Sequence, residues 1–406
     1  MPHAQADLAH PDLTQRINAL RQLHSATARP PTRGTNVHVH SNHSFGVFRS
    51  PCEAVWEARQ AGIEVFGIND FYTTSGFAEF SAACSIVGIP AVLGLEAIAV
   101  DRELAAHGTL VNDPANPGKI YLCAKAVTQP DQPRAQVALA RLRQFQEVRN
   151  QALIAKADEH FQRTIQAAGP VWGTIIALTP EGNTTERHVA KAILLHLQVL
   201  ANGRPGVLED LFHKVVGVPM KGSDADQQNT VRSNLLKTGK PCYAAEDPAA
   251  FPSVTELRAI FTDLGAIPTY PFLGNPLTGG ETDVSAWCDR LEGWGFCALE
   301  LIPSRNTDDR VAAVVAEANK RQWPIFDGTE HNTPVMESLT TKWGLDDRFR
   351  SAFRTSALVA LGHQCLRLRG APGFTDDVGR PIAGGFQRCL AAGGDLVKGL
   401  DFAGRG

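Results

Sequence analysis

The chain has no long apolar run, no large excess of one charge and no paired-cysteine motif, and each absence excludes a class of protein. Its 406 residues hold 39 Lys and Arg against 42 Asp and Glu, so the charge gives no reason to expect nucleic acid as a partner. The N-terminus, MPHAQADLAHPDLTQRINAL, breaks up its apolar residues with charge and proline. It resembles neither a signal-peptide core nor a membrane span. We expect a cytoplasmic protein without membrane contact.

Three common catalytic or metal-binding motifs are also missing. The eight cysteines form no CxxC pair, so a zinc ribbon and a thioredoxin motif are excluded, and reduced, mostly buried thiols are expected. The chain has no GxSxG nucleophile elbow and no P-loop. These absences argue against serine hydrolases and P-loop enzymes.

What the sequence does contain is typical of a globular protein with many strand-to-helix turns. Hydrophobic residues make up 43% and charged residues 20%, with 36 glycines and 25 prolines. Strand-like segments such as TNVHVH (35–40), EVFGIND (64–70) and PAVLGLEAIAV (90–100) are separated by helical segments. Three strands alternating with helices predict parallel βαβ units.

Between about 129 and 238 the pattern becomes mostly helical, and Asn183 is the expected cap of one of these helices. The strand and helix alternation resumes near 253 and ends near 334. We predict an α/β fold, a distorted (β/α)7-type TIM-like barrel with an inserted helical subdomain. The expected segments are an N-terminal helical extension (1–33), the first part of the barrel (34–128), the insertion (129–250), the second part of the barrel (251–334), and C-terminal helices with a tail (335–406).

Polar side chains gather where the proposed strands end, and among them His38 and His40 form a His-x-His pair. Residues i and i+2 of a strand point to the same side, so the two imidazoles can bind one ion. The carboxyl ends of barrel strands converge on one rim, where active sites are built. By itself the pair is a weak signal, because surface and capping histidines are common.

The order of the motifs strengthens the metal interpretation. The His-x-His strand, GIND (67–70), GLE (94–96), GAIPTYP (265–271) and GTEHN (328–332) together resemble the PHP family, the polymerase and histidinol phosphatase metal-dependent hydrolases. The resemblance covers about 34–101 and 253–334. It is closest to a bacterial subgroup with a large helical insertion and with elements like TERH (185–188) and PSRNT (303–307).

The resemblance implies one metal site rather than the family's cluster of three. It assigns the first metal to His38, His40, Glu96 and Glu330. The other metals depend on positions that have changed to Phe45, Phe71, Tyr270 and Asn332. Phenylalanine cannot bind a metal, so we expect one divalent ion per chain, and zinc, manganese and iron all suit these ligands.

Other residues are candidates for proton transfer and substrate binding. Tyr270, Asp70 and His331 are the candidates for proton transfer, and Asp70 is alternatively a residue that orients a ligand histidine. Glu300 either faces the site or caps the following turn. The candidate substrate contacts are Arg305, Asn306, Lys221, Arg187 and His43. For each of these, a packed or solvated side chain is the alternative.

The sequence therefore predicts a metal-dependent hydrolase of a small polar or anionic substrate, with phosphoester hydrolysis through a metal-activated water as the family's usual reaction. One alternative is a mononuclear lyase, isomerase or lactone or amide hydrolase in which Tyr270 moves the proton. Another is a non-catalytic binding protein. A homo-oligomer is possible, with the insertion as a lid or an oligomer surface.

Overall fold

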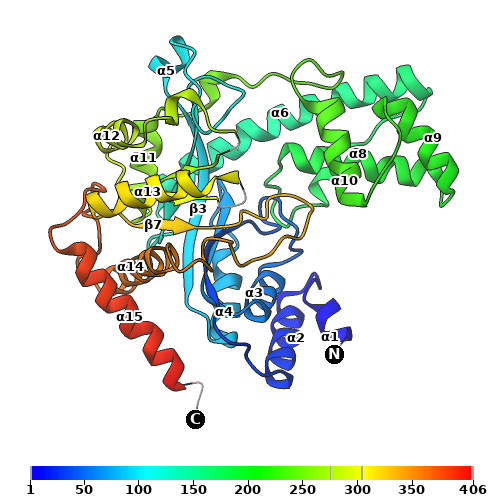
Figure 1. Cartoon of the computed structure of the whole chain (residues 1–406). Helices are drawn as coiled ribbons and strands as arrows, with labels where there is room; N and C mark the ends of the chain where they lie inside the picture. The colour runs from blue at the N-terminus through cyan, green and yellow to red at the C-terminus, as the bar shows by residue number, and fades with distance from the viewer. Residues whose placement is uncertain (1, 275, 303–304, 404–406) are drawn as a thin grey trace.

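The computed structural model describes residues 2–274, 276–302 and 305–403, and the side chains of 5–399 within these ranges. Pro303 and Ser304 of the PSRNT motif lie outside the described residues. Figure 1 shows a strand-centred body from which a group of helices projects on one side.

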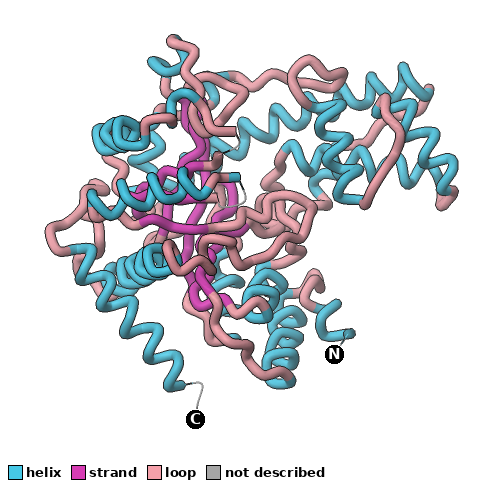
Figure 2. The backbone as a smooth tube through the Cα atoms, in the orientation of Figure 1, coloured by secondary structure: helices cyan, strands magenta, loops and turns pink. Residues whose placement is uncertain are grey.

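The body is built on a seven-stranded mixed sheet that is nearly closed into a barrel (Figure 2). The strands follow one another in chain order around it. A parallel bridge between Val39 and Glu330 joins the first strand to the segment after the last. The α/β barrel prediction is confirmed. The strands are β1 (Gly34–Val39), β2 (Ile63–Phe71), β3 (Ala91–Val100), β4 (Lys119–Lys125), β5 (Ile267–Phe272), β6 (Ala298–Leu301) and β7 (Ile325–Asp327).

Strand β4 corrects the expectation of a purely parallel sheet. It is antiparallel to both β3 and β5, whereas the other adjacent pairs are parallel. Cys123 of β4 pairs with Glu96 on one side and with Thr269 on the other. Alternate residues of a strand share a face, so Lys125 lies on the same inner face of the barrel as Cys123. A strand missed in the sequence thus contributes to the barrel interior.

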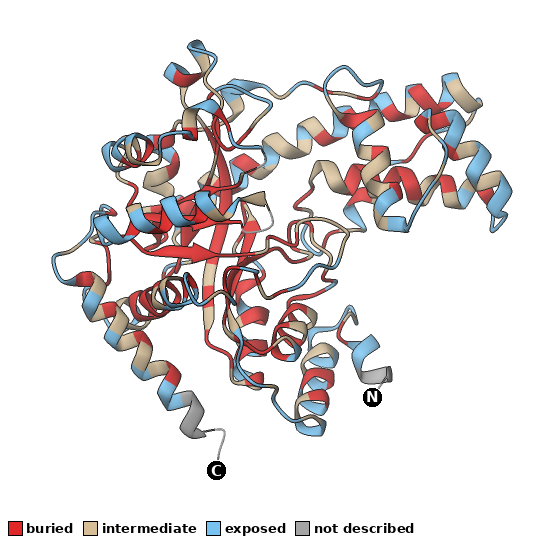
Figure 3. Ribbon diagram, viewed as in Figure 1, coloured by how far each residue is buried: buried red, intermediate tan, exposed pale blue. Residues whose placement is uncertain are grey.

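Helices cover the outer face of the barrel. Helix α4 packs on β2 and β3, α11 on β3 and β5, α13 on β6, and α14 on β1, β3 and β7. Figure 3 shows their buried residues turned toward the strands. The helices outside the insertion are α1 (Pro2–Asp7), α2 (Leu13–Ala26), α3 (Pro51–Gln60), α4 (Phe77–Val87), α5 (Arg102–Ala106), α11 (Val254–Asp263), α12 (Val284–Gly293), α13 (Asp308–Arg321), α14 (Arg350–Leu368) and α15 (Gly385–Ala403), with 3-10 turns at Pro248–Ala250 and Gly279–Glu281.

The inserted segment has an apolar core of its own. Leu153, Phe161, Leu197 and Phe212 belong to a buried cluster separate from that of the barrel, whereas Leu139 of the same long helix α6 belongs to the barrel cluster. Helix α6 therefore connects the two cores (Figure 1). The helices here are α6 (Pro133–Ile165), α7 (Trp172–Ile176), α8 (Glu186–Ala201), α9 (Pro205–Val216) and α10 (Asp224–Val231), followed by a π-helical turn at Arg232–Leu236.

Local capping explains where α8 begins and how the insertion is attached to the barrel. Thr185 is the N-cap of α8 and forms a reciprocal capping box with His188. The expectation that Asn183 is the cap was wrong. Asn183 instead donates through Nδ2 to the carbonyl oxygens of His43 (2.9 Å) and Phe71 (2.8 Å), which lie at the barrel rim. The start of α8 is thereby tied to that rim.

Within the described ranges, we find no helix that combines the length and the apolar character needed to span a bilayer.

We predict that Asp327 makes stability fall as pH rises. Its carboxylate joins β7 to Thr35 of β1 (2.9 Å) and to Thr341 (2.9 Å). Burial raises its pKa from 3.8 to about 7, and the two hydroxyls oppose the shift only partly. Between these values the folded chain binds more protons than the unfolded chain, so this group's stabilising contribution declines by at most about 1.4 kcal/mol per pH unit.

Asp327→Asn should therefore gain stability relative to the parent chain as pH rises from about 4 to about 7. Urea unfolding of both proteins across this range measures the difference. A constant difference between the two proteins would contradict the prediction.

Candidate metal centre

His38 lies on β1 and His40 directly after it, and both imidazoles are fully buried inside the barrel. Their Nε2 atoms are 3.2 Å apart. A Cβ on Gly328, in the turn after β7, would stand 2.2 Å from the His38 Cβ, so glycine is needed for this close approach. The His-x-His pair thus brings two ring nitrogens to one point, as the sequence predicted.

Glu96 of β3 adds a carboxylate to the two imidazoles. Its Oε2 lies 3.7 Å from His38 Nε2 and 3.2 Å from His40 Nε2. Donor atoms around a tetrahedral ion at about 2.0–2.2 Å are roughly 3.3–3.6 Å apart, close to these spacings. The buried Oε2 has no hydrogen-bond partner among the described residues. We call His38, His40 and Glu96 the ligand triad, and its donor set fits a divalent ion.

A buried chain of charges orients His38. The Oε2 atom of Glu300 on β6 lies 3.0 Å from His38 Nδ1, and the Lys125 ammonium contacts Glu300 Oε1 (2.8 Å) and the Val37 carbonyl oxygen (3.0 Å). Burial disfavours a charged imidazole, but Glu300 outweighs it and raises the pKa of His38 to about 9. A carboxylate on Nδ1 directs Nε2 toward the ligand triad. Glu300 therefore faces the site and does not cap a turn.

A second relay orients His40. Its Nδ1 lies 3.0 Å from Ser44 Oγ, which donates to Asp70 Oδ1 (2.6 Å). Asp70 also accepts from the backbone N–H (2.7 Å) and hydroxyl (2.6 Å) of Ser41. Because its oxygens are engaged in this way, the geometry favours the orienting role for Asp70 over direct proton transfer.

A competing group formed by His38, Cys123 and Glu300 also has the composition of a metal site. Lys125 already neutralises Glu300 there. Burial raises the pKa of the Cys123 thiol well above its usual value, which disfavours the thiolate that a metal requires. The ligand triad is therefore the better candidate.

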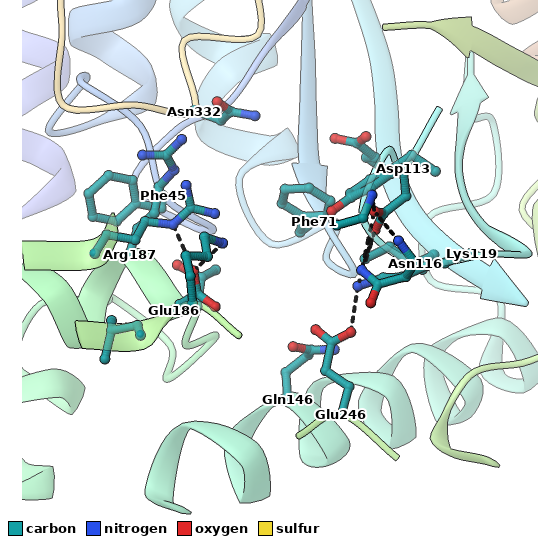
Figure 4. A pocket seen from close by; sticks show the side chains of 18 of the residues that line it. Phe45, Phe71, Asp113, Asn116, Lys119, Gln146, Glu186, Arg187, Glu246 and Asn332 are labelled. Atoms are coloured by element: carbon teal, nitrogen blue, oxygen red, sulfur yellow. Dashed lines mark hydrogen bonds and ion pairs between the residues drawn. The ribbon is translucent and has the colours of Figure 1, made fainter. Parts of the chain in front are cut away.

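Glu96 of the triad lines a cavity of about 470 Å³ between the barrel rim and the insertion. Glu96 and Glu330 both line it. Figure 4 shows Phe45, Arg187 and Glu186 on one side and Asp113, Lys119 and Glu246 on the other. The positive side chains on its wall are Lys119, Arg149, Arg187, Arg232, Lys237 and Arg305.

Glu330 lies on the cavity wall outside the ligand triad. Its Oε2 accepts from Arg305 (2.5 Å) and from Asn332 Nδ2 (3.2 Å). Glu330 and His331 have φ values of 57° and 53°, a left-handed conformation that is costly for residues with a side chain. Their loop is held against β1, where His40 donates its N–H to the Glu330 carbonyl oxygen (2.7 Å). Metal binding by Glu330 stays a prediction, because its Oε2 atom is paired with Arg305 and Glu330 belongs to no group of possible metal ligands among the described residues.

Tyr270 is not brought to the site. Pro271, its neighbour on β5, pairs with Glu300 of the inner face, so Tyr270 points outward. Its ring packs edge-on against Trp287 with centroids 5.3 Å apart, and its hydroxyl donates to Glu281 (2.9 Å). Burial and the neighbouring Glu281 raise the pKa of the Tyr270 phenol well above its ordinary value. This placement gives no support to proton transfer by Tyr270.

His331 and His43 are packed loop histidines. His331 bonds through Nδ1 to the Thr329 hydroxyl (2.7 Å) and through Nε2 to the Glu337 carbonyl oxygen (3.1 Å). Neither nitrogen is left to move a substrate proton. His43 is buried beside Gly76 and does not line the cavity. Neither histidine belongs to a group of possible metal ligands among the described residues.

Two of the five candidate substrate contacts line the cavity. Arg187 and Arg305 do, whereas Lys221 is exposed outside it. Asn306 does not line it either, and donates to the carbonyl oxygens of Phe272 and Ile302. The amide holds a turn together, which explains why Asn306 is unavailable to a substrate.

Sequence reasoning missed Ser44 and Lys125. Lys125 was missed together with its strand, although Lys119, Tyr121, Cys123 and Lys125 alternate with apolar residues, a period-2 signal for a strand. Ser44 gave no signal that would separate it from the other residues of its loop. Its role depends on the path of the backbone back toward His40.

Two solved structures share this fold. A candidate metal-dependent phosphoesterase from Bifidobacterium adolescentis has a TM-score of 0.53 and 20% identity, with 80% of this chain and 96% of that chain covered. An amidohydrolase from Chromobacterium violaceum, with bound sulfate and no metal, has a TM-score of 0.52 and 16% identity, covering 75% and 92%. Models of known protein families give no match to the chain, and no curated protein has significant similarity to it.

We predict that Ser44→Ala weakens metal binding while Ser41→Ala does not. Both hydroxyls donate to Asp70, but Ser44 alone of the two contacts His40. Loss of such an orienting partner typically costs 10- to 100-fold in metal affinity. Competition with a chromophoric zinc chelator measures the affinity. Equal losses in the two variants would show that the contact between Ser44 and His40 does not by itself orient the imidazole.

Proposed function

We propose that the chain is a metal-dependent hydrolase of the PHP type that cleaves a phosphoester in a small polar or anionic substrate. One divalent ion per chain, zinc, manganese or iron, would be held by His38, His40 and Glu96. The observation that carries the proposal is the convergence of their Nε2 and Oε2 atoms within 3.7 Å of one another beside a cavity lined by charged side chains. The Bifidobacterium adolescentis neighbour, described as a candidate metal-dependent phosphoesterase, supports it.

The bound ion would lower the pKa of a water molecule toward about 7 and polarise a substrate oxygen. Glu300 and Ser44 orient the imidazoles that hold it, so the donor atoms are in place before binding. Phe45 and Phe71 occupy positions where the family has ligands, and both line the cavity. Positive side chains are then needed to neutralise charge that other metals would neutralise. Arg305 and Arg187 line the same cavity as Glu330.

Hydrolysis of an amide or lactone is the second candidate. The Chromobacterium violaceum neighbour is described as an amidohydrolase, and a single metal suffices to polarise a carbonyl oxygen. The form of this alternative that uses Tyr270 loses its basis, because the phenol lies on the outer face of the sheet.

The test compares His40→Ala with Tyr270→Phe. We expect purified parent protein to contain about one divalent ion and to hydrolyse a phosphomonoester such as para-nitrophenyl phosphate. His40→Ala should lose the ion and the activity, because it removes a ligand of the triad. Elemental analysis and release of nitrophenolate measure the two effects.

Tyr270→Phe should keep both the ion and the activity, although it loses the buried hydrogen bond to Glu281 (2.9 Å). Loss of turnover in this variant with normal metal content would favour the mechanism in which Tyr270 moves a proton. Full activity of His40→Ala would refute the proposed metal centre.

A further inference from the structure

The chain has four tyrosines, and one of them presents its hydroxyl to the cavity that Glu96 lines. Tyr121 of β4 lines that cavity and is only partly buried. Within the described ranges its hydroxyl forms no hydrogen bond. The other tyrosines of the barrel differ, since the Tyr72 hydroxyl is buried and the Tyr270 hydroxyl donates to Glu281. Tyr121 is therefore the barrel tyrosine that is able to give a hydrogen bond to a bound molecule.

The register of β4 places Tyr121 near the ligand triad. Cys123, two residues further on, pairs with Glu96, and alternate residues of a strand share a face. Because β3 and β4 are antiparallel, Tyr121 lies about 7 Å beyond Cys123 toward the rim. The centroid of the Phe71 ring is 4.8 Å from that of His40 and 6.2 Å from that of Tyr121. One aromatic ring thus separates Tyr121 from a candidate metal ligand.

The Asn112 side chain holds the backbone of Tyr121 in this place. It accepts from the Tyr121 N–H (2.9 Å) and donates to the Tyr121 carbonyl oxygen (2.9 Å). The same amide donates to the carbonyl oxygen of Pro271 on β5 (3.0 Å). Proline has no N–H to offer a neighbouring strand, and the amide of Asn112 supplies the missing donor. The position of the phenol is therefore set before a substrate binds.

Lys119 provides a positive charge beside this phenol. Its ammonium lies 6.0 Å from the centroid of the Tyr121 ring and is held by Glu246 (2.5 Å) and Asp113 (3.6 Å). Figure 4 shows these three charged side chains on one side of the cavity. Burial raises the pKa of Tyr121 to about 12, against the effect of Lys119, and the carboxylates of Asp113, Glu96 and Glu246 also raise it. The phenol is therefore protonated at neutral pH, and the ammonium can stabilise a phenolate.

We propose that Tyr121 is the general acid that protonates the leaving oxygen when the phosphoester is hydrolysed. The inference rests on the proposed function. Water adds its oxygen to phosphorus, the bond from phosphorus to the leaving oxygen breaks, and that oxygen keeps the electron pair and takes the Tyr121 proton. The proton released by the water restores the phenol, so one water is consumed and one alcohol is formed. Phosphate esters of aliphatic alcohols, whose leaving oxygen is strongly basic, depend most on this proton and are the favoured substrate class.

The experiment compares two phosphomonoesters of similar shape, para-nitrophenyl phosphate and para-nitrobenzyl phosphate, by release of inorganic phosphate. Nitrophenolate is a weak base that leaves without a proton, whereas the nitrobenzyl alkoxide is a strong base that needs one. Tyr121→Phe should lower kcat for the nitrobenzyl ester about 100-fold or more, with KM unchanged. The same variant should turn over the nitrophenyl ester at nearly the rate of the parent. Elemental analysis should find its metal content equal to that of the parent.

Tyr270→Phe is the matched control, because it removes a phenol hydroxyl on the outer face of the sheet. It should hydrolyse both esters as the parent does. Equal losses for the two esters in Tyr121→Phe, or loss of the ion from this variant, would overturn the inference, since the hydroxyl would then act in binding or in folding. A parent that hydrolyses the nitrophenyl ester and not the nitrobenzyl ester would overturn it as well.

Tyr121→His gives a second test if circular dichroism shows that Tyr121→Phe does not fold. An imidazole with a pKa near about 6.5 carries a transferable proton in acid and loses it as pH rises. The ratio of nitrobenzyl to nitrophenyl turnover should therefore fall between about pH 6 and about pH 8 in this variant, relative to the parent. A ratio that follows that of the parent would contradict the inference.

The two proposals fail in different ways. If the proposed function is wrong, the parent hydrolyses neither ester, and the inference falls with it. If only the general acid is wrong, the parent hydrolyses both esters and Tyr121→Phe keeps the ratio of their kcat values.

Discussion

The buried chain from Lys125 through Glu300 to His38 is the constraint on which the candidate site depends. All three side chains are fully buried, and an isolated charge of this kind would cost several kcal/mol. Each charge is tolerated because the next one compensates it, at 2.8 and 3.0 Å. These contacts form only if the side chains of β1, β4 and β6 meet in the barrel interior. The orientation of His38 therefore depends on the closure of the barrel.

The antiparallel strand β4 makes this arrangement possible. It runs between β3, which carries Glu96, and β5. Its inner face supplies Lys125, the cation that begins the buried series of charges from Lys125 through Glu300 to His38. The Lys125 ammonium lies 2.8 Å from Glu300 Oε1 and balances the charge of that buried carboxylate.

The insertion completes the site from the opposite side. Helix α6 belongs to both apolar cores, and Asn183 bonds to carbonyl oxygens at the barrel rim. The start of α8 is therefore positioned by the barrel and not only by its own core. Lys119 of β4 and Glu246, 2.5 Å apart, form a further contact across the cavity. The two walls differ in charge, since the carboxylates of the barrel wall face the cations of the insertion wall.

The sequence by itself determined the barrel class and indicated His38, His40 and Glu96 as candidate ligands, because alternation and motif order are local properties. It could not determine what Glu330, Tyr270 and Lys125 do. Glu330 pairs with Arg305 and Tyr270 points outward, whereas Lys125 reaches a strand far along the chain. The tertiary structure decided these roles, because register, strand direction and burial determine which charges meet, and none of the three is encoded within one segment.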